Sequence, residues 1–147
     1  AWPEVALAGA RQLVSNGGTA AQARAWLLPV WERVAAGEET LTSTQRSAIV
    51  AALEPGLEDI DGDWLQRIEA AYQRYPNRAD MQYLMGMACM KRQLWGKAQQ
   101  FLSQATHGLQ DEPELRRNAW RALAELAEER SDAAAAQQAW KQAALVR

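Results

Sequence analysis

A pattern of small and large apolar residues that returns after 38 residues constrains this chain more than any other feature. Gly86 is echoed by Ala124, and Leu102 by Trp140. The other matched pairs are Met85 with Leu123, Cys89 with Ala127, Ala98 with Ala136, and Ala105 with Ala143. In each copy apolar residues recur every three or four positions on both sides of a short turn, which is typical of two amphipathic helices. A helix pair that recurs predicts a stacked array of helical repeats.

Glycine and proline positions divide the remaining chain into further helices, and no stretch alternates with a period of two. The expected fold is therefore all-α, with about eight helices in antiparallel pairs. The predicted helices cover residues 3–15, 19–36, 42–53, 63–75, 79–92, 95–107, 112–130 and 133–146. Pro29 lies inside the second helix, where we expect a kink or a short break.

Polar residues at the starts of several segments predict helix caps. Each pairs an N-cap side chain with a polar side chain three residues later, which is the spacing of a capping box. The predicted pairs are Thr19 with Gln22, Asp63 with Gln66, and Asp111 with Glu114. The third helix is expected to start at Thr42 or Ser43, and the last at Ser131 or Asp132.

Length and charge limit the possible classes of protein. The 147 residues, of which 48% are hydrophobic, suit one domain over 1–147. A formal net charge of −2 removes the electrostatic footprint of a nucleic-acid binder and of a protein held to membranes by charge alone. One cysteine excludes an internal disulfide, and no apolar run is long enough to span a bilayer. Because no initiator methionine precedes Ala1, we expect a fragment of a longer protein.

The repeat resembles the tetratricopeptide pattern, which has a 34-residue period. Pro76 lies where that motif closes a repeat, three residues before Ala79 opens the next. On this resemblance, 79–147 holds two clear repeats, 57–78 the second half of an earlier repeat, and 1–56 degenerate repeats. The resemblance implies a right-handed superhelical array. The extra four residues of the 38-residue spacing fall in the connector 106–113.

A narrower resemblance points to the C-terminal half of the bacterial HemY family. The stretches that carry it are 63–76, 84–86, 94–98, 119–124 and 134–136, with 17–18 and 25–26 fitting the family's middle region. The resemblance implies an inner-membrane protein associated with late protohaem biosynthesis, whose membrane helices lie outside this chain. It implies a soluble domain on the cytoplasmic side. The flavin-dependent oxidase that shares the name would need a G-x-G-x-x-G fingerprint, which this chain lacks.

In a tetratricopeptide array the first helix of each pair lines a concave groove. The positions expected to line it are Tyr83, Met87, Met90 and Lys91 on one helix, and Arg121, Glu125 and Glu128 on the next. The basic and amide residues of the family's peptide-carboxylate clamp are missing, because Tyr83 and Met87 stand in their places. Met87 and Met90 fit a groove and an interior equally well.

The sequence offers few candidates for catalysis or metal binding. Cys89 occupies a small-residue packing position, where a core thiol is expected. His107 ends a helix, where the helix dipole favours it; haem ligation is the alternative that the family resemblance suggests. Glu58, Asp59, Asp61 and Asp63 form an acidic cluster. The last three match the first three ligands of a calcium loop, but the sixth position is Trp64 where glycine is required and the twelfth is Ala70 where glutamate is required. An acidic helix N-terminus is the simpler interpretation.

Most of the tryptophans fall on apolar helical stripes and are expected in the core. These are Trp26, Trp64, Trp95, Trp120 and Trp140, with Trp31 either in the core or at a groove. Trp2 is expected to pack against helices outside the chain.

The sequence therefore predicts a non-enzymatic interaction scaffold that binds a protein or peptide segment in its groove, with no catalytic residue and no metal site. The alternative is a protein that holds haem or porphyrin in the same groove. No nucleic-acid partner is expected, and membrane anchoring is expected only through segments outside this chain.

Overall fold

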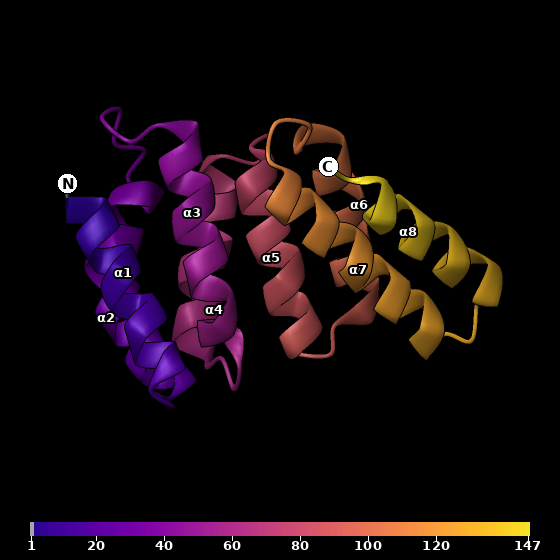
Figure 1. The fold of residues 1–147 in the computed structure, drawn as a ribbon, viewed down its shortest axis with the longest axis horizontal. Coiled ribbons are helices and arrows are strands. Elements are labelled where there is room, and N and C mark those ends of the chain that lie inside the picture. Colours follow the sequence, from indigo (N-terminus) through magenta and orange to yellow (C-terminus); the bar gives the residue numbers. More distant parts are fainter. Residues whose placement is uncertain (1) are drawn as a thin grey trace. The chain divides into compact units, whose positions relative to one another are not determined.

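The computed structural model describes residues 2–147, and the side chains from Glu4 onward. The described residues form eight α-helices and one 3₁₀-helix and contain no strand, which confirms the all-α prediction (Figure 1). The elements are α1 (Trp2–Ser15), α2 (Ala20–Ala35), α3 (Ser43–Leu53), η1 (Glu54–Leu57), α4 (Gly62–Arg74), α5 (Ala79–Lys91), α6 (Trp95–Gly108), α7 (Pro113–Glu129) and α8 (Ala133–Leu145). The packing predicted for Trp2 lies outside the described side chains.

Local side-chain chemistry starts several helices where the sequence predicts. Thr19 caps α2 in a reciprocal capping box with Gln22, and Thr42 caps α3 in the same way with Gln45. Asp132 caps α8 by accepting a hydrogen bond from the backbone N–H of Ala135. These bonds satisfy donors that a helix start leaves without partners.

Two predicted caps are wrong, and the break, one of the two possibilities expected at Pro29, is absent, whereas a kink there stays a prediction. Asp61, rather than Asp63, accepts the hydrogen bond from the backbone N–H of Trp64 at the start of α4. The residue before α7 is Glu112, which makes no side-chain capping bond. α2 continues through Pro29 without a break, and Pro29 is exposed, so its ring meets solvent at the helix surface.

The chain divides into two compact units, Ala1–Arg67 and Ile68–Arg147, with the boundary inside α4. In the first unit α1, α2 and α3 pack on one another, and η1 packs on α2 and α3. The buried Arg24 of α2 donates through Nη1 to the carbonyl oxygens of Gly56 (2.7 Å) and Glu58 (2.9 Å). This guanidinium therefore ties the segment after α3 to α2. The single continuous array expected over 1–147, and its superhelical twist, stay predictions.

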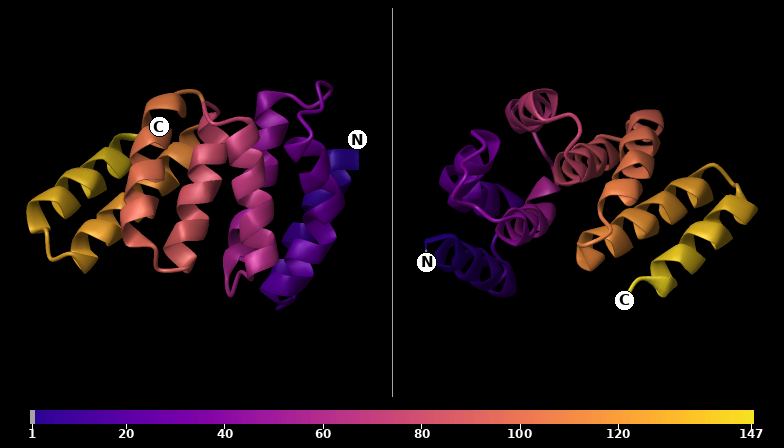
Figure 2. Two further views of the ribbon diagram at one scale, coloured as in Figure 1. Left: turned by 180° about the vertical axis from the view of Figure 1, so that it is seen from behind. Right: turned by 90° about the horizontal axis from the view of Figure 1, so that it is seen from above.

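The second unit contains the two helix pairs that the 38-residue echo predicts. α5 packs against α6 and α7 against α8, and α7 also contacts α5 and α6 (Figures 1 and 2). A Cβ atom added to Gly86 would lie 2.6 Å from Cγ of Leu102, closer than van der Waals contact allows. Glycine is therefore needed at this contact between α5 and α6. No helix among the described residues is long and apolar enough to cross a membrane.

Candidate functional site

The groove positions predicted on α5 do not form an exposed surface together. Tyr83 has none of its surface exposed, Met87 and Met90 are half-buried, and Lys91 is exposed. α5 packs against both α6 and α7, so most of its circumference is enclosed. The assignment of Tyr83 to an open groove is therefore corrected: this side chain belongs to the interior.

The groove positions predicted on α7 are exposed, and one of them lines a pocket. Arg121, Glu125 and Glu128 all reach solvent. Arg121 lines an open pocket of about 310 Å³, which the remaining two residues do not line. We call this the arginine pocket, formed by Arg117, Arg121, Trp140, Ala143 and Ala144. Both helices of the last pair therefore contribute to it.

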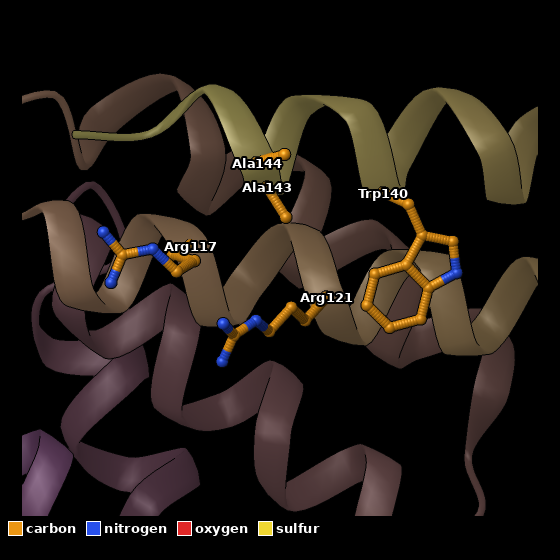
Figure 3. Close-up of a pocket in the computed structure, with 5 residues that line it drawn as sticks. All are labelled: Arg117, Arg121, Trp140, Ala143 and Ala144. Atoms are coloured by element: carbon orange, nitrogen blue, oxygen red, sulfur yellow. The ribbon is translucent and has the colours of Figure 1, made fainter.

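The walls of the arginine pocket differ in chemistry. Arg117 and Arg121 extend from α7, one helical turn apart, and the Trp140 ring reaches across from α8 (Figure 3). Two small residues of α8, Ala143 and Ala144, complete the lining. The pocket thus combines two planar cations with one flat aromatic surface.

Each guanidinium group offers several N–H donors in a planar arrangement and no acceptor. Arg117 makes one long hydrogen bond, from Nη2 to the carbonyl oxygen of Val146 (3.4 Å). Among the described residues no carboxylate forms an ion pair with Arg117 or Arg121. These two side chains therefore retain donors for a ligand that supplies acceptors.

Trp140 is not a core residue, which corrects the prediction from its apolar stripe. Its side chain is 41% exposed, and its indole Nε1 donates to Oε1 of Glu128 at 2.7 Å. This bond satisfies the polar edge of the ring and leaves its apolar surface at the pocket. α8 packs chiefly on α7, so nothing among the described residues encloses the outer side of the ring.

The other tryptophans also differ in burial, and some of them are exposed. Trp31 and Trp64 are buried, as predicted, and Trp120 is half-buried. Trp26 (52% exposed) and Trp95 (36% exposed) lie at the surface, contrary to prediction. The indole Nε1 of Trp26 donates to the carbonyl oxygen of Ala6 (2.9 Å), so its polar edge is satisfied without full burial.

The two candidate reactive residues lie away from the arginine pocket. Cys89 is fully buried, and burial raises the pKa of its thiol above the ordinary value. His107 is exposed in the last turn of α6, and its Nδ1 lies 2.9 Å from the carbonyl oxygen of Ser103. A carbonyl only accepts, so Nδ1 donates there. No group of three metal-binding side chains occurs among the described residues.

Sequence reasoning missed Arg117, Ala143 and Ala144 as site residues. The spacing of Arg117 and Arg121, four residues apart on one helix, already indicates that the two cations share a face. The sequence could not indicate that α8 presents Trp140 to the same face. No family model, curated protein sequence or solved structure matches this chain.

Proposed function

We propose that the chain is a non-enzymatic interaction module that binds an acidic segment of a partner protein in the arginine pocket. The observation that carries the proposal is the pair of guanidinium groups without carboxylate partners, beside the exposed Trp140 ring. Arginine binds carboxylates through two parallel hydrogen bonds, a geometry that selects planar anions.

The pocket is suited to side chains of a peptide. Its volume of about 310 Å³ lies at the lower end of the range for ligand sites, so it accommodates a few side chains at a time. An acidic residue would contact Arg117 and Arg121, while a neighbouring apolar residue would pack on Trp140. Aromatic and arginine residues contribute most of the binding energy in protein interfaces.

The wider assignment is part of the same proposal: a tetratricopeptide array from a HemY-like inner-membrane protein associated with haem biosynthesis. Besides the sequence resemblance, the equivalence of the two helix pairs supports the repeat. α5 and α7 end in the same hydrogen-bonded turn, in which the backbone N–H groups of Leu94 and Asp132 donate to the carbonyls of Cys89 and Ala127, both at 2.8 Å.

The test is binding of a short fluorescein-labelled peptide of alternating glutamate and leucine, followed by anisotropy at low salt. The double variant Arg117→Gln, Arg121→Gln should weaken binding about tenfold or more, because charge-assisted hydrogen bonds are lost. The control Arg11→Gln, Lys141→Gln removes the same charge at two exposed positions outside the pocket and should leave the affinity nearly unchanged. Equal weakening by both variants would show that the peptide responds to net charge alone.

A porphyrin is the second candidate ligand, because its propionates and flat ring match the same two guanidinium groups and the same indole. Titration of hemin distinguishes the candidates. A saturable Soret shift that disappears in Arg117→Gln, Arg121→Gln but persists in His107→Ala would place the porphyrin in the arginine pocket. A shift lost in His107→Ala would support ligation by this histidine, and the absence of any shift would leave the peptide proposal.

A further inference from the structure

The turn between α5 and α6 carries two large apolar side chains at the protein surface. Leu94 is 41% exposed and Trp95 is 36% exposed. Three exposed cations, Lys91, Arg92 and Lys97, flank them within seven residues. We call residues 91–97 the basic-apolar turn.

The backbone of this turn does not require large apolar residues. Gln93 adopts a left-handed conformation (φ +60°), and Ser131 adopts the same conformation (φ +57°) in the turn between α7 and α8. The hydrogen bonds of the two turns also correspond. Asp132 and Ala133 occupy the places of Leu94 and Trp95 in the second turn, so the same geometry forms with small or polar side chains.

Leu94 also occupies a position where a polar residue would stabilise the following helix. It is the N-cap residue of α6 and makes no side-chain capping bond, whereas Asp132 caps α8 with its carboxylate. Leucine is among the least favourable N-cap residues. The N-terminus of α6 therefore lacks the side-chain cap that its equivalent helix α8 has.

Charge separates the two turns as well. The basic-apolar turn has three cations and no carboxylate. The equivalent residues 129–135 contain Glu129, Arg130 and Asp132, which sum to −1. The basic-apolar turn therefore carries a local charge of +3 where the apolar side chains are exposed, in a chain whose net charge is −2.

We propose that the basic-apolar turn docks onto an anionic phospholipid surface. Leu94 and Trp95 enter the headgroup region, while Lys91, Arg92 and Lys97 contact lipid phosphates. Tryptophan is favoured at membrane interfaces because its ring is apolar and its N–H is polar. Lysine and arginine extend long apolar stems that let the charge stay at the phosphate level. The proposal requires these cations to be exposed and does not depend on their lacking contacts within the chain.

Charge complementarity selects this occupant over a second copy of the chain. Two copies meeting through this turn would bring six cations together without a carboxylate from either turn. An anionic lipid surface instead supplies negative charge across a plane and an apolar layer beneath it. The equivalent α7–α8 turn carries net negative charge, so it is not expected to take part in the contact.

Co-sedimentation with vesicles tests the proposal. The chain should sediment with phosphatidylcholine vesicles that contain about one third phosphatidylglycerol, stay in solution with pure phosphatidylcholine, and be released by salt. Each of Lys91→Gln and Lys97→Gln should lower the partition coefficient about fivefold, the factor expected for one cation at such a surface.

The variant Leu94→Asp, Trp95→Ala reproduces the residues of the α7–α8 turn. It should therefore fold, because the introduced carboxylate would cap α6 and offset part of the packing lost with the Trp95 ring, and it should lose vesicle binding. Trp140→Ala removes an exposed indole elsewhere and should leave vesicle binding unchanged. Peptide binding in the arginine pocket should be weakened by Trp140→Ala and unchanged in Leu94→Asp, Trp95→Ala. The experiments can therefore disprove either proposal without affecting the other.

Three results would overturn the proposal. The first is absence of binding to the anionic vesicles, or equal binding to pure phosphatidylcholine. The second is unchanged vesicle binding by the folded Leu94→Asp, Trp95→Ala variant. The third is self-association without vesicles that this variant abolishes, which would assign the turn to a second copy of the chain.

Discussion

The α5–α6 and α7–α8 pairs share their spacing and their turn geometry, yet equivalent residues differ in burial. Leu102 of α6 has no exposed surface, whereas its equivalent Trp140 of α8 is 41% exposed. Opposite them, Gly86 and Ala124 are both buried. Equivalent positions of the two pairs therefore have the same backbone geometry, but their side chains can be core residues in one pair and surface residues in the other.

The neighbours of each pair explain the difference. α6 is covered by α5 and α7, and Phe101 of α6 packs edge-on against Tyr72 of α4, with ring centroids 4.9 Å apart. α8 packs chiefly on α7. The same apolar stripe is therefore buried on α6, which has helices on both sides. On α8, which has a helix on one side only, the stripe forms a candidate binding surface.

The largest effect is expected from truncating the two equivalent side chains. Leu102→Ala should lower the free energy of unfolding by about 2–5 kcal/mol, because a fully buried leucine leaves a cavity. Trp140→Ala should cost about 1 kcal/mol or less, because much of the ring already meets solvent. Urea denaturation followed by circular dichroism measures both. Equal losses would contradict the contrast between the pairs.

A smaller effect is expected from exchanging the small residues. Gly86→Ala should destabilise the protein by about 1–3 kcal/mol, because the new Cβ overlaps Leu102. Ala124→Gly should cost only about 0.5–1 kcal/mol, mainly through backbone entropy. Adding Leu102→Ala to Gly86→Ala should cost less than the sum of the single changes. Additive losses would show that this contact is not the source of the strain.

The smallest effect distinguishes Cys89 from its equivalent Ala127. Burial raises the pKa of the Cys89 thiol, so the folded state holds this proton more strongly than the unfolded state. The contribution is fully present below the thiol pKa of the unfolded chain, roughly 8.5, and is lost as pH rises through the higher folded pKa. Stability of the wild type should therefore fall more steeply above that pH than stability of Cys89→Ala. Parallel profiles would contradict this assignment.

Helix boundaries and most caps follow from neighbouring residues alone. Thr19 and Thr42 start helices because a hydroxyl and an amide three residues apart satisfy each other's backbone donors, which involves no distant contact. The close approach at Gly86 was also predictable, because the 38-residue echo places small residues opposite large ones. The shift from Asp63 to Asp61 shows the limit: several carboxylates compete for one helix start, and backbone geometry selects among them.

The exposure of a side chain on an apolar stripe depends on which helices pack beside that stripe. The residue pattern within one helix does not contain this information. Tyr83 and Trp140 both lie on faces that periodicity predicts, but packing buries the first and leaves the second at a pocket. The arginine pocket needs α7 and α8 side by side before Arg117, Arg121 and Trp140 form one surface. Where each helix begins and ends is thus determined by hydrogen bonds between residues close together in the sequence. The candidate site is determined by contacts between residues that lie far apart in the sequence.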